Sequence, residues 1–240
     1  MIFEPPFIQA TFLKRYKRFL ADVLLDNGEI ITVHCPNTGS MKCCQVEESP
    51  CWISLANKSG RKLPGTLEIV TTANGDLAGV NTSRPNHLVR EAIENGTVCE
   101  LAGFDSIRNE VKYGAEGSRI DLLLTCGDRH CYVEVKNVTL EAGNGLIVFP
   151  DAVTARGTKH LRELMAMVAE GHRALLFFCV QHSGARHVSP AAEIDPVYTS
   201  TLKEAIAAGV EVLAYGCRVT AEEIAIDHKI DFTVDPPTQP

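Results

Sequence analysis

The sequence lacks an apolar run long enough to cross a membrane, which takes about 18 residues or more. Its N-terminal segment carries Lys14, Arg15, Lys17 and Arg18 where a secretory signal would have an apolar core. Neither a membrane span nor secretion is therefore indicated, and we expect the cytoplasm. None of the nine cysteines shows C-x-x-C spacing, which favours reduced, structural thiols over a common zinc or disulfide motif. Aromatic residues are few, at 6%, and apart from Trp52 they show no platform pattern for binding a sugar.

The 240 residues are 45% hydrophobic, which is enough for a real core in one large or two ordinary domains. A net charge of −7 argues at first against a nucleic-acid partner, because binding to the phosphate backbone depends on cationic side chains. The charge is unevenly divided, however. Residues 1–85 hold nine Lys and Arg against eight Asp and Glu, whereas residues 86–240 hold fourteen against twenty-two. Local basic clusters therefore matter more than the total.

Two segments, 118–125 and 131–136, are rich in leucine and β-branched residues and predict a buried β-hairpin. Side chains alternate along a strand, so Glu134 and Lys136 should share a face, with Asp121 on the neighbouring strand beside them. Ionised groups inside a core are costly unless they are paired or bound to metal. The alternative is an ordinary strand pair in which Asp121 caps a turn and Glu134 pairs with Lys136 at the surface.

Two carboxylates beside a lysine can hold a hard divalent cation, Mg²⁺ or Mn²⁺, and orient a water for attack on a phosphodiester. Asp121 and Glu134 are the candidate metal ligands, and Lys136 is the third candidate catalytic group. Glu91, at the edge of the apolar stripe of a helix expected near 87–94, is a candidate third metal ligand. A solvated glutamate at a helix edge is the alternative reading of Glu91.

Residues 1–85 contain about five short strands with turn signals, which suggests a small closed β-barrel of the oligonucleotide-binding (OB) class. Cationic and aromatic side chains alternate in the first strand, as in proteins that bind single strands, and the alternative is a solvated edge strand. A loop with five small or turn-forming residues follows at 34–41, and its polar groups could cradle phosphate or simply form a surface loop. The candidate nucleic-acid contacts of the barrel are Lys14, Arg15, Lys17, Arg18, Asn37, Thr38 and Ser40.

Residues 79–86 are expected to link two domains, 1–82 and 83–240, and a domain junction is a favoured place for a binding cleft. Asn81, Ser83 and Arg84 are candidate phosphate contacts there, unless Ser83 or Asn86 caps the following helix. Arg156 and Lys159 lie where another helix is expected to begin, and a helix N-terminus attracts anions. Solvated helix cations are the alternative. The order of helices and strands after residue 86 indicates an α/β domain.

Five motifs in the same order, spread over nearly the whole chain, resemble the sugar fermentation stimulation protein family of bacteria and archaea. They are His34–Met41, Val80–Asn86, Ser118–Asp121, Val133–Leu140 and Phe149–Gly157. The resemblance implies an OB-fold-like barrel joined to a PD-(D/E)xK nuclease-like domain, DNA binding, and a regulatory role in sugar (maltose) metabolism. The superfamily's acidic ligands carry over to Asp121 and Glu134, and its lysine to Lys136. The sequence departs from the motif at Ile120, where the proline would stand.

Together these features predict a DNA-binding protein, largely independent of DNA sequence, whose C-terminal domain has a Mg²⁺-dependent phosphodiesterase site. The alternative is a non-catalytic DNA-binding regulator of sugar (maltose) metabolism, acting in transcription regulation. Whether cleavage occurs stays open at this point, and so does the oligomeric state, a homodimer included.

Overall fold

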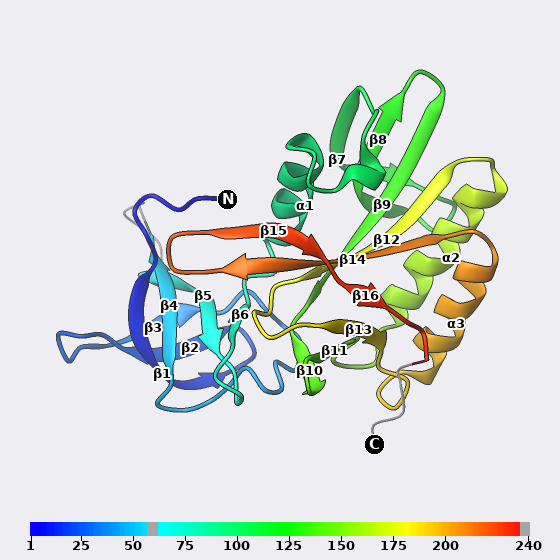
Figure 1. The fold of residues 1–240 in the computed structure, drawn as a ribbon. Coiled ribbons are helices and arrows are strands. Elements are labelled where there is room, and N and C mark those ends of the chain that lie inside the picture. The colour runs from blue at the N-terminus through cyan, green and yellow to red at the C-terminus, as the bar shows by residue number, and fades with distance from the viewer. Residues whose placement is uncertain (57–61, 236–240) are drawn as a thin grey trace.

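The computed structural model describes residues 1–56 and 62–235 and shows a barrel joined to a larger α/β unit (Figure 1). The barrel contains β1 (Ile8–Tyr16), β2 (Leu20–Leu24), β3 (Ile30–His34), β4 (Pro50–Leu55), β5 (Gly65–Thr71) and β6 (Leu77–Gly79). The strand order is β3-β2-β1-β4-β5-β6, and a parallel contact between His34 and Thr66 closes β3 onto β5. Phe12, Ile53 and Leu67 fill the interior, each no more than 1% exposed. The predicted OB-like barrel is confirmed.

The central sheet of the C-terminal part has the strand order β15-β14-β12-β9-β8-β7. Its strands are β7 (Ser106–Tyr113), β8 (Ser118–Cys126), β9 (Arg129–Val138), β12 (Arg173–Val180), β14 (Glu211–Val219) and β15 (Ile224–Lys229). The middle strands β9, β12 and β14 are parallel, and β12 is apolar on both faces, as a strand covered from both sides must be. The predicted hairpin is confirmed as β8 and β9.

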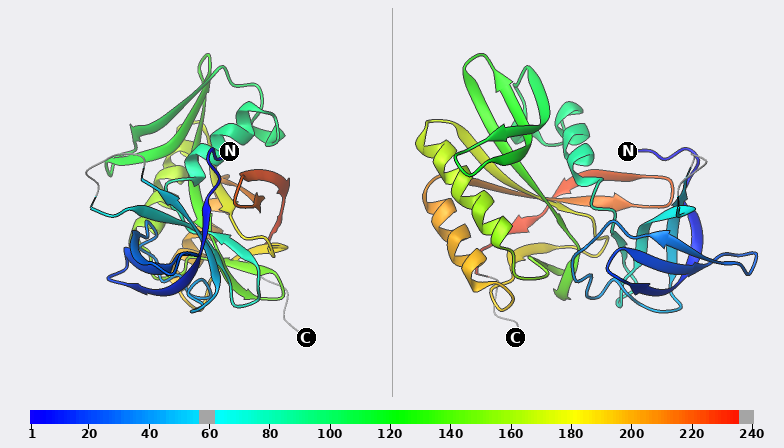
Figure 2. Two further views of the ribbon diagram at one scale, coloured as in Figure 1. Left: turned by 90° about the vertical axis from the view of Figure 1, so that its left-hand side faces the viewer. Right: turned by 180° about the vertical axis from the view of Figure 1, so that it is seen from behind.

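Helices cover both faces of this sheet, which makes a three-layer α/β arrangement (Figure 2). The helix α1 (Pro85–Glu94) packs on one face, while α2 (Ala155–Ala169) and α3 (Pro196–Ala207) lie together on the other. The buried Asp195 carboxylate fixes the start of both α2 and α3, because it accepts hydrogen bonds from the backbone N–H groups of Tyr198 and Thr154. A 3₁₀ turn, η1 (Cys99–Leu101), follows α1.

A smaller sheet lies beside the central one and borders the barrel (Figure 1). It contains β10 (Leu140–Gly143), β11 (Leu146–Phe149), β13 (His187–Pro190) and β16 (Asp231–Phe232). No helix within residues 1–56 and 62–235 has the length and apolar character needed to cross a membrane. All nine cysteines are free thiols.

The segment before β1 does not belong to the barrel but packs on the C-terminal part. The backbone N–H groups of Phe3 and Phe7 donate to carbonyls in the β14–β15 turn, and both rings lie in the core beneath α1. Neither this contact nor the strand β15 was predicted from the sequence. The expected cap of α1 by Ser83 or Asn86 is also wrong, since Arg84 is the N-cap residue and makes no side-chain cap bond.

A buried ion pair connects the barrel to the start of α1. Glu68 of β5 is 1% exposed, and its carboxylate accepts two hydrogen bonds from the Arg84 guanidinium at 2.8 and 3.1 Å. Asn81 donates a third at 2.9 Å. The guanidinium also lies over the rings of Phe3 and Phe7. Arg84 therefore holds together the barrel, the linker and the N-terminal segment.

We predict that Arg84→Ala lowers the free energy of unfolding by about 3–5 kcal/mol, because the buried Glu68 charge loses its cation. Arg90→Ala is the control, since Arg90 and Glu94 form an exposed pair one helical turn apart that contributes about 0.5 kcal/mol or less. Urea denaturation of both variants measures the difference. Equal losses would show that the Arg84 pair does not join the two parts.

Candidate metal centre and nucleic-acid interface

The strands β8 and β9 diverge at Asp121, and this divergence creates the candidate metal centre. The backbone pairing between β8 and β9 ends with Leu122 and Val133. Next to this pair, the Val135 N–H donates to the Asp121 carboxylate at 2.8 Å instead of to the backbone of β8. The strand also changes face here, since Ile120 packs with the cluster beneath α2 and α3 while Leu122 packs with that beneath α1. The side chain of Asn86, at the start of α1, donates to the other Asp121 oxygen at 2.9 Å.

Glu134 is the most deeply buried member of the centre, at 2% exposure. One carboxylate oxygen, Oε1, contacts the Lys136 ammonium at 2.5 Å and the Nδ1 atom of His160 on α2. The other oxygen, Oε2, is buried and has no hydrogen-bond partner among the residues that the structure describes. A buried carboxylate oxygen is expected to be satisfied, so the free Oε2 is a place where a cation fits.

The electrostatics of the two carboxylates differ. Burial and the neighbouring Glu134 charge raise the pKa of Asp121 from 3.8 to about 6, against the smaller effects of the Val135 N–H, Lys136 and Asn86. Burial also raises the pKa of Glu134, but Lys136 and His160 outweigh it and hold that pKa below its ordinary value. Of the two carboxylates, Asp121 is therefore the one whose charge is less well compensated by nearby cations.

The structure does not bring Glu91 together with these two carboxylates. Its side chain forms an ion pair with the N-terminal amine of Met1 at 2.7 Å. Over the described parts of the chain, only Asp76, Glu141 and His182 bring three His, Cys, Asp or Glu ligand atoms within 4.8 Å of one another. A metal at Asp121 and Glu134 would consequently take its remaining ligands from water, backbone or substrate.

The four cationic side chains at the end of β1 and in the following turn have different surroundings. Arg15 donates to the carbonyls of Arg18, Asn37 and Gly39, and so ties the loop after β3 to the end of β1. Lys14 lies 3.6 Å from Asp22. Lys17 and Arg18 form the β1–β2 turn, where both adopt positive φ angles of 49° and 63° and are exposed. This conformation is unfavourable for residues other than glycine, so two bulky cations here are unusual.

The loop at 36–41 lies against the C-terminal part, close to the metal centre. Ser40 donates to Asp151 at 3.1 Å, and the side chain of Asn37 accepts from the Gly39 N–H at 2.8 Å. Asn37 lines a small pocket together with Asn137, the residue after Lys136. Thr38 is exposed on the same loop. The barrel loop and the Glu134–Lys136 strand therefore border one junction.

The remaining candidate nucleic-acid contacts are mostly engaged within the protein. Asn81 bonds Glu68 and accepts from the backbone and hydroxyl of Ser83, while Arg84 is held by Glu68. Arg156 is exposed and donates to His160 at 3.3 Å, and Lys159 donates to the Glu116 carbonyl at 2.5 Å. Among these, Arg156 is linked to the metal centre, one contact from Glu134 through His160.

Two residues of the metal centre were not predicted from the sequence. His160 is not among the candidate site residues, and Asn86 is considered only as a possible helix cap. The helical spacing of Arg156 and His160 could have indicated that both face one site. Nothing local, by contrast, indicates that Asn86 meets a strand far along the chain.

Comparison with known proteins gives matches to both parts of the chain. The family model described as "SfsA N-terminal OB domain" matches residues 13–80, and the model "Sugar fermentation stimulation protein RE domain" matches residues 83–223. Relatives named sugar fermentation stimulation protein homolog include one from Teredinibacter turnerae, 61% identical over 94% of this chain and 97% of that protein. Another, from Saccharophagus degradans, is 56% identical over 96% of this chain and 99% of that protein.

A solved structure has the same fold over nearly the whole length. It is described as Pyrococcus furiosus SfsA in complex with Ca²⁺, and it is 26% identical with a TM-score of 0.86, covering 98% of each chain. Two family models together span most of the sequence, and the two relatives just named cover 94% and 96% of it. The chain therefore belongs to the sugar fermentation stimulation protein family.

Proposed function

We propose that the protein binds DNA, largely independently of sequence, and that Asp121, Glu134 and Lys136 form a Mg²⁺- or Mn²⁺-dependent phosphodiesterase site of the PD-(D/E)xK type. The observation that carries the proposal is the buried Glu134 carboxylate, whose Oε2 atom has no hydrogen-bond partner among the described residues and whose neighbour Asp121 is less well compensated by cations. Both features fit a divalent cation held by oxygen ligands. The Ca²⁺ complex of the P. furiosus relative supports a site of this kind in the family.

The residues of the centre have distinct parts in this proposal. Asp121 and Glu134 would hold the ion, which when bound supplies Lewis-acid polarisation of a phosphodiester and activation of a water. Lys136 has three ammonium donors and gives one to Glu134, so the others remain for a phosphate oxygen or the attacking water. His160 holds the Glu134 carboxylate in place, and Asn86 holds that of Asp121.

The DNA-binding part of the proposal is supported by the β1–β2 turn. A tight turn with two left-handed residues ordinarily uses Asn or Gly, yet here Lys17 and Arg18 take these positions and are exposed. An outlier of this kind motivates a functional hypothesis, namely that the turn presents two cations to phosphate. Arg15, by contrast, supports the loop that carries Thr38 and Ser40.

We predict that Lys17→Gln together with Arg18→Gln weakens binding about equally for unrelated DNA sequences. The slope of log affinity against log salt should fall by about one for each lost phosphate contact. Fluorescence anisotropy across a salt series measures both quantities. Lys203→Gln, which removes an exposed cation from α3, is the control, and an unchanged salt slope in the turn variant would remove this turn from the DNA interface.

A second prediction concerns Asp121→Asn, which keeps the shape of the side chain but removes its charge. Metal-dependent cleavage of plasmid or single-stranded DNA should be lost, whereas DNA binding in chelator should be retained. Asp128→Asn, at the exposed turn of the same hairpin, is the control and should cleave normally. If the wild-type protein shows no cleavage and no binding of Mg²⁺ or Mn²⁺ that Asp121→Asn removes, the protein binds DNA without cutting it.

The same substitution has a predicted effect on stability that does not depend on catalysis. Because the folded-state pKa of Asp121 is about 6 and its ordinary value is 3.8, the wild type loses stability as the pH rises through this interval. Asn cannot ionise, so in chelator at pH 7 the variant should be more stable, by on the order of 1–3 kcal/mol. Chemical denaturation at pH 4 and pH 7 measures this. A stability gain that is the same at both pH values would contradict the assignment of a repulsive carboxylate pair.

A further inference from the structure

We propose that Asp76, Glu141 and His182 form a second metal site, for a divalent transition-metal ion of the Zn²⁺ class, where the barrel meets the C-terminal part. The three side chains come from the β5–β6 turn, from β10 and from the residue pair that follows β12. One ligand atom from each lies within 4.8 Å of the other two. The Nε2 atom of His182 is 3.8 Å from an oxygen of Glu141, which is too far for a hydrogen bond but close enough for both to reach one ion.

Buried polar atoms of the proposed site lack a cation that would pair with them. The side chain of His182 is fully buried, and its Nε2 atom has no hydrogen-bond partner in the described part of the chain. The Glu141 side chain is only 6% exposed. Within residues 1–56 and 62–235, no Lys or Arg forms a salt bridge with Asp76 or Glu141. Among these residues, the carboxylates of Glu141 and the half-buried Asp76 therefore lie close to the buried imidazole of His182 without a cation, although buried polar and charged groups are costly unless paired or metal-bound.

Neighbouring residues hold each candidate ligand in position, as is usual around metal sites. The Asn74 side chain donates to Glu141 at 2.6 Å, and the Ser183 hydroxyl donates to Asp76 at 3.1 Å. Residue 184 is glycine, and a Cβ atom there would collide with the Asp76 carboxylate. The backbone is therefore shaped to admit this carboxylate beside His182.

The mixture of one imidazole and two carboxylates selects the kind of ion. Imidazole and carboxylate together suit Zn²⁺ and related first-row ions, whereas Mg²⁺ prefers ligands that are all oxygen. Coordination through Nε2 places the ring proton of His182 on Nδ1, which now accepts a 3.2 Å bond from the Gly184 N–H. Metal binding must break this long bond, so a local shift of Gly184 should accompany it.

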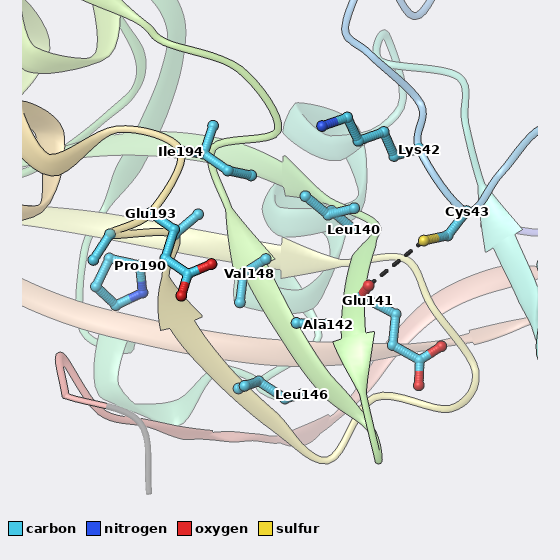
Figure 3. Close-up of a pocket in the computed structure, with 12 residues that line it drawn as sticks. Lys42, Cys43, Leu140, Glu141, Ala142, Leu146, Val148, Pro190, Glu193 and Ile194 are labelled. Carbon is cyan, nitrogen blue, oxygen red and sulfur yellow. Dashed lines mark hydrogen bonds between the residues drawn. The ribbon is translucent and has the colours of Figure 1, made fainter. Parts of the chain in front are cut away.

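An ion at this position would join the two parts of the protein. The strand β6 of the barrel already pairs with the segment after β12, since the Ser183 N–H donates to Leu77 and the Gly79 N–H donates to Gln181, both at 2.9 Å. Glu141 also contributes to the lining of an adjacent pocket of about 660 Å³. Figure 3 shows the Glu141 carboxylate pointing away from the pocket residues Val148 and Pro190, on the other side of β10. The role of the ion would be to fix the barrel on the C-terminal part.

The test uses the full chain, freed of metal with a chelator and kept reduced. Calorimetric titration with Zn²⁺ is compared for wild type, Asp76→Asn, Asp121→Asn and Glu193→Gln. Glu193 is an exposed carboxylate in the neighbouring pocket, and Asp121 belongs to the other proposed centre. Visible absorption of the Co²⁺-loaded protein distinguishes nitrogen and oxygen ligands from thiolates, because Cys43 and Cys99 are exposed. Melting temperatures with and without Zn²⁺ report the effect on the junction.

We expect Asp76→Asn to weaken Zn²⁺ binding at least tenfold and to lose the rise in melting temperature that Zn²⁺ gives the wild type. Glu193→Gln should keep both, Asp121→Asn should keep the Zn²⁺ binding that Asp76→Asn loses, and Mg²⁺ should not compete for that binding. Glu141→Gln should repeat the result if Asp76→Asn alters the metal-free melting temperature. Equal Zn²⁺ binding by wild type and both site variants, no Zn²⁺ binding by the wild type, or a Co²⁺ spectrum with thiolate charge-transfer bands would overturn the proposal. Loss of Zn²⁺ binding in Asp121→Asn alone would overturn it too, by assigning the ion to the other centre.

Discussion

Two carboxylates lie side by side in a buried hairpin, and the arrangement of the C-terminal part depends on the groups that offset their repulsion. Repulsion between Asp121 and Glu134 is offset on one side by Lys136 and His160, which hold one Glu134 oxygen. On the other side, Asn86 and the Val135 N–H hold Asp121. These partners come from α1, β9 and α2, so the layers on both faces of the sheet converge on one point. Desolvation still raises the Asp121 pKa to about 6, which leaves the pair short of one positive charge.

Polar contacts join the barrel to the C-terminal part. The Glu68–Arg84 ion pair joins β5 to α1, Ser40 joins the loop after β3 to Asp151, and Asp76 approaches His182 on the other side of β6. Several residues first considered as phosphate contacts, notably Arg15, Asn81 and Arg84, satisfy groups of the protein instead of facing outward. Lys17 and Arg18 stay exposed, at a turn whose backbone conformation they do not favour.

Local patterns in the sequence predicted the strands and the faces of their side chains but not the partners across the fold. Alternation correctly placed Glu134 and Lys136 together, and the barrel followed from short strands with turn residues between them. Asn86 and His160 reach the centre from helices that precede and follow the hairpin, and no periodicity encodes such contacts. Asp76, Glu141 and His182 are similarly dispersed, which is why their proximity became visible only in three dimensions.

The most direct test of the metal centre is the location of a bound ion by anomalous diffraction from crystals soaked in Mn²⁺. We predict a Mn²⁺ peak bonded to the free Oε2 atom of Glu134 and to Asp121, and no such peak in crystals of Asp121→Asn. A wild-type crystal that diffracts well, is saturated with Mn²⁺ and shows no peak beside Glu134 would contradict this assignment.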